Sequence, residues 1–266
     1  MKNFKRASFL AFGCSIMVIA FLCGMLFSSY NVSAGLTDRI STATNFYDDW
    51  HGKKVAWYGD SLTELYYHCD MVNQYFEFDA YNCGIRGAAI SNFNDNEINM
   101  CRESRTEYPG IEIPADVEVI FIMAGTNDWC GDVPLGDKKL VFDGNGNPMV
   151  DEMTFYGGCH MMFNYLTRKY PDAYILVMGT PIVASNTYNL YNGQGLTSFD
   201  YGDALCEAAA MWGIQSFNIG EMMGINVHNV QDADGEMYEG VHFTEGAARK
   251  AANVIIQEIC SRRYYN

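Results

Sequence analysis

The sequence predicts an α/β protein in which helices cover both faces of a mostly parallel sheet of about five strands. From residue 53 onward, short and nearly continuous apolar runs alternate with longer segments of helical character. Strands that are buried on both faces have such unbroken apolar runs, and alternation of strand and helix is typical of a parallel sheet. Unusual polar residues also follow directly after the apolar runs. Ligands of parallel sheets bind beyond the carboxyl ends of the strands, so this arrangement favours the same fold class.

Five apolar runs are the predicted strands, and four mixed segments are the predicted helices. Each run is short enough for a buried strand, and each mixed segment is long enough for a helix that crosses over or covers the sheet. Thr244 is the predicted N-cap of the last helix, because a threonine hydroxyl accepts a hydrogen bond from the first turn. The predicted strands are 55–58, 76–81, 117–123, 174–178 and 214–219, and the predicted helices are 62–73, 155–168, 201–212 and 245–260.

The first 34 residues predict export of the chain. After three basic residues among the first six, no charged residue occurs until Asp38, and the apolar stretch 8–27 is long enough to span a bilayer as a helix. The basic residues precede this stretch, which places the rest of the chain outside the cytoplasm. Small residues at 32–34 resemble a signal-peptidase site. The segment is therefore either a cleaved signal peptide or an uncleaved signal anchor that holds the protein on the membrane.

Charge and composition bound the remaining possibilities. The 17 basic and 32 acidic residues give a formal net charge of −15, and the basic residues after the N-terminus are scattered. A nucleic-acid backbone would be repelled, so we expect no nucleic-acid partner. The chain is 49% hydrophobic, which is enough for a substantial core. We predict a linker over 35–52 and the folded domain over 53–266.

Cysteines and acidic residues do not form a recognisable metal site in the sequence. No cysteine pair has C-x-x-C spacing, and the five histidines do not cluster with the cysteines. Segment 143–152 has alternating Asp and Asn residues but lacks the glycine and glutamate of an EF-hand loop, so we predict a β-hairpin turn and no metal. Export permits disulfides, but an odd number of cysteines leaves at least one thiol unpaired. The seven cysteines after Ala34 are Cys69, Cys83, Cys101, Cys130, Cys159, Cys206 and Cys260.

Four groups of polar residues are expected to meet at one edge of the sheet. "GDSL" at 59–62 follows the first predicted strand, "NCGIRG" at 82–87 follows the second, and "GTND" at 125–128 follows the third. "YEGVHF" at 238–243 precedes the last predicted helix and can reach the same edge. The carboxyl ends of parallel strands meet at one edge, and this edge is therefore the predicted site.

These groups contain the residue types that a serine esterase needs. A serine hydroxyl is a nucleophile when a base takes its proton, and the usual base is a neutral histidine that a carboxylate orients. Ser61, His242 and Glu239 supply the three groups. Charge that develops on the substrate carbonyl oxygen needs hydrogen-bond donors fixed in advance. The backbone N–H groups of Ser61 and Gly87 and the side-chain amide of Asn127 would form this oxyanion hole.

In this order, the four groups resemble the four sequence blocks of the SGNH (GDSL-type) hydrolase family, over residues from about 53 to about 262. The resemblance implies a three-layer α/β/α, flavodoxin-like fold and an esterase, lipase or carbohydrate deacetylase that uses no metal or organic cofactor. It also implies roles for four residues. Ser61 is the nucleophile and first oxyanion donor, Gly87 and Asn127 are the other donors, and His242 is the base.

The acid of the triad is the point at which the sequence departs from the family. The family usually has aspartate three residues before the histidine, whereas this chain has Glu239, whose additional methylene changes its reach to the imidazole. Asp232 or Asp234 could replace it, or a backbone carbonyl could orient His242. The neighbouring Asp60 is expected to be structural, because an aspartate at this position bonds to nearby backbone N–H groups.

The leading functional hypothesis is an exported serine esterase that removes small acyl groups, acetyl above all, from a carbohydrate or glycan. Segments 143–152 and 187–200 are expected to overhang the site and to form, with Trp129, a polar cleft with an aromatic edge that suits a sugar. The substrate would be a small-molecule or polysaccharide acyl ester. Two alternatives remain open at this stage. One is an acyltransferase that passes the acyl group to a sugar hydroxyl, and the other is a non-catalytic glycan-binding module.

Overall fold

The computed structural model describes residues 47–65, 67–93, 99–101, 112–181, 183, 190–226, 228–230 and 237–264. Residues 47–49 are helical, and a compact unit begins at Trp50. The predicted export segment and most of the predicted linker lie outside the described residues, so both remain predictions. Among the residues that are described, no helix has the length and apolar character needed to cross a membrane.

Five parallel strands form the central sheet, in the order β2-β1-β3-β4-β5. This order is that of the flavodoxin-type doubly wound sheet. The three central strands are almost completely buried, as their apolar runs predicted. The bounds are Lys54–Gly59 for β1, Asp79–Gly84 for β2, Val119–Met123 for β3, Tyr174–Gly179 for β4 and Gln215–Asn218 for β5.

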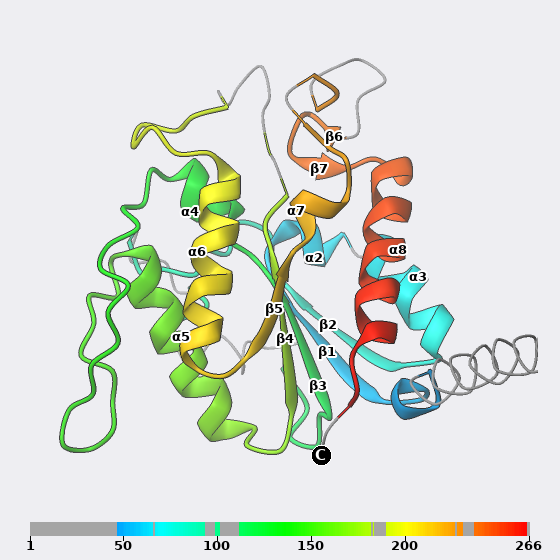
Figure 1. Cartoon of the computed structure of the whole chain (residues 1–266), viewed down its shortest axis with the longest axis horizontal. Helices are drawn as coiled ribbons and strands as arrows, with labels where there is room; N and C mark the ends of the chain where they lie inside the picture. Colours follow the sequence, from blue (N-terminus) through cyan, green and yellow to red (C-terminus); the bar gives the residue numbers. More distant parts are fainter. Residues whose placement is uncertain are drawn as a thin grey trace, which may run out of the picture. The chain divides into compact units, whose positions relative to one another are not determined.

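Helices cover both faces of the sheet and complete a three-layer α/β/α sandwich, which confirms the predicted fold class (Figure 1). Helices α3 and α8 lie on one face, and α5 and α6 lie on the other. Three short helices, α2, α4 and α7, follow directly after β1, β3 and β5. The bounds are Ser61–Glu64 for α2, Tyr67–Phe76 for α3, Thr126–Cys130 for α4, Phe155–Lys169 for α5, Ser198–Met211 for α6, Ile219–Met222 for α7 and Glu245–Ser261 for α8.

The second strand differs from its prediction. Residues 76–81 were the predicted strand, but Phe76 ends α3 and β2 begins at Asp79. The buried rings of Phe76 and Phe78 stack with their centroids 5.1 Å apart, so this apolar run belongs to a helix end and its core contact. The predicted helix 62–73 is likewise divided into α2 and α3. The other strands and helices lie within three residues of their predicted bounds.

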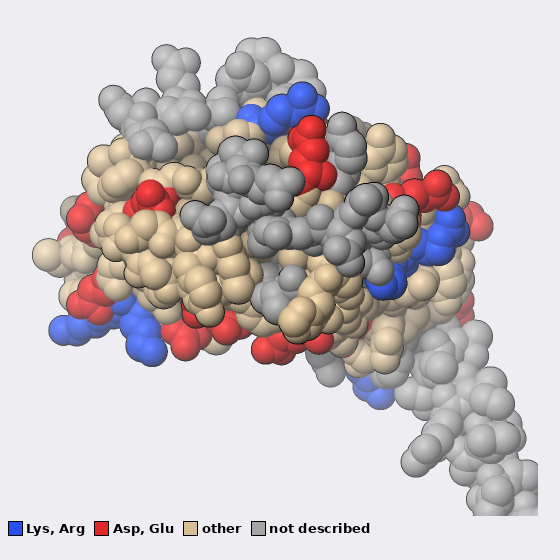
Figure 2. All heavy atoms as spheres, turned by 90° about the horizontal axis from the view of Figure 1, so that it is seen from above, with Lys and Arg blue, Asp and Glu red and all other residues tan. Residues whose placement is uncertain are grey.

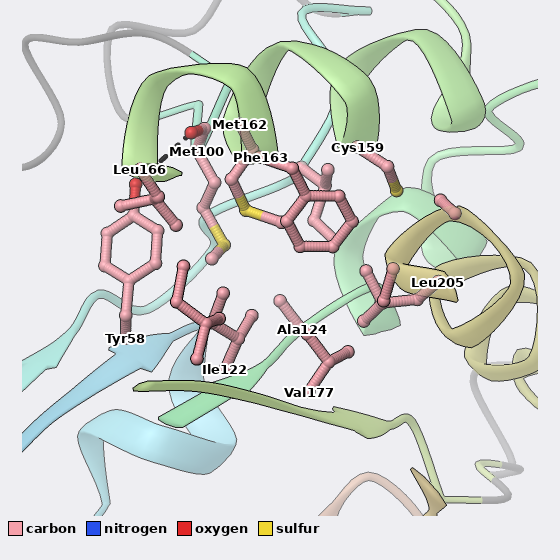
Figure 3. Packing of buried hydrophobic residues seen from close by; sticks show 14 of the residues in the cluster. Tyr58, Met100, Ile122, Ala124, Cys159, Met162, Phe163, Leu166, Val177 and Leu205 are labelled. Carbon is pink, nitrogen blue, oxygen red and sulfur yellow. Dashed lines mark hydrogen bonds between the residues drawn. The ribbon is translucent and has the colours of Figure 1, made fainter. Parts of the chain in front are cut away.

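The core between the sheet and α5 contains aliphatic, aromatic and sulfur-containing side chains (Figure 3). Ile122 of β3 and Val177 of β4 point toward Met162 and Phe163 of α5. Burial of each such side chain stabilises the fold by about 1.5–3 kcal/mol. The phenol of Tyr58 donates a hydrogen bond to the Met100 carbonyl at 3.2 Å, so the one polar group at this position has a partner.

In the described part of the chain, none of the seven cysteines after Ala34 forms a disulfide. Four of them are buried: Cys69, Cys83, Cys101 and Cys159. Buried free cysteines pack as small apolar side chains. Burial also raises the pKa of the Cys159 thiol, which keeps it protonated and unreactive.

Candidate active site

Ser61 lies at the carboxyl edge of the sheet, where β1 ends and α2 begins. Asp60 is the N-cap of α2, and its Oδ1 accepts a hydrogen bond from the Leu62 amide at 2.9 Å, which agrees with a structural role for this aspartate. A glycine is required at Gly59, because a Cβ there would lie 2.2 Å from the Met123 carbonyl oxygen. This close approach packs the end of β1, two residues before Ser61, against the end of the neighbouring strand β3.

His242 is brought to Ser61 by a small antiparallel hairpin. Strands β6 (Met237–Tyr238) and β7 (His242–Phe243) pair just before α8, whose N-cap is Thr244, as predicted. The Nε2 atom of His242 lies 3.0 Å from the Oγ atom of Ser61, across 181 positions of sequence. This is hydrogen-bond distance, and it is the geometry that a base needs to take the proton of a serine hydroxyl.

Burial and neighbouring charges keep His242 in its neutral form. Half-burial lowers the pKa of His242, and the positive charge of Arg86 lowers it further. The carboxylates of Glu239 and Glu64 act in the opposite direction. Because the net effect on the pKa is downward, the imidazole is unprotonated and able to accept a proton at neutral pH.

Glu239 lies in the turn between β6 and β7 with a φ of 54°. This left-handed conformation is uncommon for a residue other than glycine, asparagine or aspartate. Its carboxylate raises the pKa of His242 through charge, but within the described part of the chain no hydrogen bond joins the two side chains. Asp232 and Asp234, the alternative acids, lie outside the described residues.

The two further residues predicted as oxyanion donors, Gly87 and Asn127, lie on segments that follow β2 and β3 at the same edge. Gly87 is exposed and has a φ of 77°, a conformation that glycine adopts without strain. Asn127 is in the first turn of α4, and its side-chain amide donates one hydrogen bond to the Ala88 carbonyl at 2.9 Å. An amide nitrogen carries two N–H groups, so the second remains for a substrate oxygen. Ser61, Gly87 and Asn127 thus come from the ends of three neighbouring strands.

Asp128 has a structural role that its place in the "GTND" block did not reveal. Its buried carboxylate accepts hydrogen bonds from the Ile90 amide at 2.8 Å and from the Ser91 amide at 2.9 Å. Burial raises the pKa of Asp128 to about 6. Together with the bond from Asn127 to Ala88, these contacts fasten the segment that carries Gly87 to the helix that carries Asn127.

Segment 143–152 forms a turn, closed by an antiparallel bridge between Phe142 and Pro148, but its predicted position is wrong. Arg168, near the C-terminal end of α5, donates a hydrogen bond to the Gly146 carbonyl at 2.7 Å. Helix α5 runs away from the carboxyl edge, so the turn lies near the opposite end of the sheet (Figure 1). The ring of Phe142 packs against Trp212, just after α6, and holds the chain in this direction.

Trp129 also differs from its prediction. It is 1% exposed and therefore does not form the edge of a cleft. Its indole N–H donates to the Leu196 carbonyl at 2.9 Å, and the Asn192 amide donates to the Trp129 carbonyl at 3.2 Å. The described part of segment 187–200 thus lies against α4, and Trp129 anchors it there. Among the described residues, no group of three or more His, Cys, Asp or Glu side chains is placed to hold a metal ion.

Comparison with solved structures identifies the fold. A protein of Lactobacillus plantarum superposes with a TM-score of 0.65 at 22% identity, covering 80% of this chain and 98% of the other. A GDSL-like lipase of Bacteroides thetaiotaomicron gives 0.50 at 17% identity, covering 78% and 87% of the two chains. A variant of a Geobacillus acetyl-xylooligosaccharide esterase gives 0.53 at 16% identity, covering 81% and 97%.

The chain therefore has a doubly wound α/β fold with its polar groups at the carboxyl edge, and within that class the fold is that of the SGNH hydrolases. The resemblance predicted from the four sequence blocks is confirmed at the level of the fold. Neither protein-family models nor curated proteins give a match to the chain.

Proposed function

We propose that the chain is a serine esterase of the SGNH type that removes small acyl groups, acetyl above all, from a carbohydrate or glycan. The single observation that carries this proposal is the distance of 3.0 Å between Ser61 Oγ and His242 Nε2. These two atoms belong to residues that the sequence blocks select independently. A nucleophile in contact with its base is the minimum arrangement for acyl transfer.

In the first half of the proposed reaction, Ser61 Oγ attacks the ester carbonyl while His242 Nε2 takes the hydroxyl proton. Negative charge then develops on the carbonyl oxygen, which the amides of Ser61, Gly87 and Asn127 stabilise. The imidazolium of His242 returns the proton to the leaving alcohol, and an acyl-enzyme on Ser61 results.

In the second half, water takes the position that the alcohol has left. His242 removes a proton from this water, which attacks the acyl carbonyl, and the same donors stabilise the second tetrahedral intermediate. Return of the proton to Ser61 Oγ releases the acid and restores the site. No further group is needed to balance the protons in either half.

We assign the acid of the triad to Glu239. Of the three candidate acids, Glu239 is closest to His242 in the sequence. Its charge also favours the imidazolium that forms during attack. The residue lies in the turn that joins β6 to β7, three positions before His242, and its φ is positive. Asp232, Asp234 and a backbone carbonyl are the alternatives that the experiments below separate.

A sugar ester suits the proposal better than a long acyl chain, since one protein of similar fold is an acetyl-xylooligosaccharide esterase. The described part of segment 187–200 carries two amide side chains near α4. Asn192 donates to the Trp129 carbonyl and to the Tyr201 hydroxyl, and Gln194 donates to the Asp132 carbonyl. We further propose that the protein acts outside the cytoplasm, because the N-terminal stretch has the composition of an export signal or anchor.

Release of free acid tests this function directly. The soluble portion is incubated with 4-nitrophenyl acetate, acetylated xylan and longer acyl esters, each with and without an acceptor sugar. We expect acetate release that disappears in Ser61→Ala. Acyl transfer to the acceptor in place of acid release would convert the assignment to a transferase. Tight glycan binding without release of acid from any ester would make the protein a binding module.

A further inference from the structure

Arg86 is a cation next to the proposed oxyanion hole, in the position directly before Gly87. Its side chain is 70% exposed. The one ion pair that it makes within the described part of the chain is with Glu64, whose Oε2 lies 3.5 Å from Arg86 Nε. That separation is longer than an ordinary hydrogen bond, so Glu64 holds the guanidinium only loosely.

The guanidinium retains most of its hydrogen-bonding capacity. An arginine carries five N–H donors, and Nε toward Glu64 accounts for one of them. The two terminal nitrogens form a planar fork that binds both oxygens of a carboxylate. Within the described residues, no hydrogen bond occupies these terminal nitrogens. The fork is therefore available to a group that arrives from outside.

The position of this cation is unfavourable for the proposed base. The charge of Arg86 lowers the pKa of His242, so it opposes the imidazolium that must form when Ser61 attacks. Burial is the larger cause of the lowered pKa of His242, and the charges of Glu239 and Glu64 act in the opposite direction to burial and Arg86. A substrate anion bound to Arg86 would neutralise this charge and remove its effect on His242.

Arg86 is a positive charge in a protein that is strongly acidic as a whole. The chain has a formal net charge of −15, which repels anions over long range. On the face seen from above, which is the carboxyl edge of the sheet, the basic side chains of the described residues lie in small separate groups and do not form one continuous patch (Figure 2). An anionic ester would therefore depend on a local contact for its binding rather than on the general field of the protein.

We propose that Arg86 forms an anion-binding subsite beside Ser61, and that the natural ester carries a carboxylate close to the scissile bond. This inference rests on the proposed esterase function and specifies its substrate class. The carboxylate belongs either to the alcohol, as in an acetylated uronic acid, or to the acyl group, as in a hemisuccinate. Both place the same chemical group at Arg86.

The test compares kcat/KM for matched pairs of esters. For the alcohol side the pair is 4-acetoxybenzoate and 4-acetoxybenzamide, and for the acyl side it is mono-4-nitrophenyl succinate and 4-nitrophenyl butyrate. Wild type, Arg86→Gln, Arg86→Lys and Arg249→Gln are measured at low and high salt. Arg249 is the matched control, because it is an exposed arginine of α8 that pairs with Glu245.

We expect Arg86→Gln to reduce the ratio of anionic to neutral kcat/KM by about 10- to 100-fold in one pair, mainly through KM, since a charge-assisted hydrogen bond is lost. Arg86→Lys should recover part of the ratio, and Arg249→Gln should leave it unchanged. With the neutral esters, the acid limb of kcat/KM in Arg86→Gln should move to higher pH, because removal of the cation raises the pKa of His242.

A ratio that stays within about twofold of wild type in both pairs would overturn the subsite. Failure of the underlying function gives a different result: neutral esters would then be hydrolysed at the same rate by wild type and by Ser61→Ala. The pair in which the ratio falls identifies the side of the ester that carries the carboxylate.

Discussion

Carboxylates occupy different environments at the two edges of the central sheet. At the carboxyl edge, Asp60 and Asp128 are completely buried and bond to backbone amides, and burial raises their pKa values to about 7 and about 6. At the amino edge, Asp116 pairs with Lys54, which lowers its pKa. Partial burial of Glu118 opposes ionisation, but the bonds from Lys53 and the Lys54 amide outweigh this and lower the pKa of Glu118.

The carboxylates of the two edges therefore differ in what they cost and what they do. Burial of a carboxylate at the carboxyl edge destabilises the fold but positions residues of the site. A buried carboxylate is costly unless its oxygens are bonded, and at the carboxyl edge its bonds fix the turns that carry Ser61 and Gly87. An exposed ion pair between lysine and carboxylate contributes little to stability. We therefore expect changes at the carboxyl edge to alter activity strongly and changes at the amino edge to alter it hardly at all.

Asn127→Ala should give the largest of these effects. It removes one donor to the developing oxyanion and also the bond to Ala88, and one such donor contributes about 100- to 1000-fold to kcat. Steady-state kinetics with 4-nitrophenyl acetate measure the loss, and circular dichroism checks the fold. Asn145→Ala, in the exposed turn at the far end of the sheet, is the matched control. An Asn127→Ala enzyme within about threefold of wild type would make Asn127 a structural residue.

Glu239→Gln should give the next largest effect. The Ser-His-Asp template loses about 10⁴ in kcat on the corresponding change. Glu239 acts on His242 through charge without a hydrogen bond in the described structure, so we expect a loss of about 10- to 100-fold. Because Glu239 raises the pKa of His242, its removal should move the acid limb of kcat/KM to lower pH.

Glu239→Asp sharpens this prediction. Aspartate tolerates a positive φ better than glutamate does, so the free energy of unfolding should be unchanged or slightly higher, while moderate activity survives. If Glu239→Gln keeps nearly full activity and Asp232→Asn or Asp234→Asn loses it, the acid comes from the upstream segment. If Glu239→Gln, Asp232→Asn and Asp234→Asn all remain active, a backbone carbonyl orients His242.

Asp60→Asn tests the cost of the buried charge. The folded-state pKa of about 7 lies above the ordinary value of 3.8, so the folded protein binds the proton more tightly than the unfolded chain does. Wild-type stability therefore falls as the pH rises from about 4 to about 7, by on the order of 1.4 kcal/mol per unit of pKa difference. Asparagine does not ionise, so Asp60→Asn lacks this pH-dependent loss. The free energy of unfolding of Asp60→Asn, relative to that of wild type, should therefore increase over the same pH range.

Urea denaturation at several pH values measures this difference. The exposed Asp172→Asn is the control and should show no such change. A stability difference between Asp60→Asn and wild type that does not vary with pH would show that Asp60 ionises in the folded protein as readily as in the unfolded chain.

Glu118→Gln, at the amino edge, should have the smallest effect. It removes the ion pair with Lys53, in which the Nζ and Oε1 atoms are 2.7 Å apart, and keeps an oxygen that accepts from the Lys54 amide. We expect a loss of less than about 1 kcal/mol in the free energy of unfolding, with kcat unchanged. A clear loss of kcat in this variant would show that the two edges are coupled, against the comparison above.

Local patterns sufficed to predict the fold and the contact between Ser61 and His242. Continuous apolar runs identified the central strands, and the rule that ligands bind at their carboxyl ends brought Ser61, Gly87 and Asn127 to one edge. The edge strand β2 was misplaced because Phe76 and Phe78 are as apolar as a strand but pack from a helix end. No short-range signal distinguishes these two cases.

Tertiary contacts decided the features that the sequence did not predict. The chain after "GTND" turns toward the amino edge because Phe142 packs on Trp212 and Arg168 binds Gly146. Trp129 is buried, and it is bonded to Asn192 and Leu196 in the described part of segment 187–200. The anchoring role of Asp128 depends on two backbone amides from a segment 37 and 38 positions earlier, a pairing that spacing alone does not reveal.

The most direct measurement of the central claim is reaction of the soluble portion with a fluorophosphonate, followed by intact-mass analysis and peptide mapping. The proposed pair of Ser61 and His242 predicts one label per chain, on the peptide that contains Ser61, with a labelling rate that falls at least about 100-fold in His242→Ala. The label should be absent in Ser61→Ala. Labelling at another serine, or labelling of Ser61 at an equal rate without His242, would contradict the account.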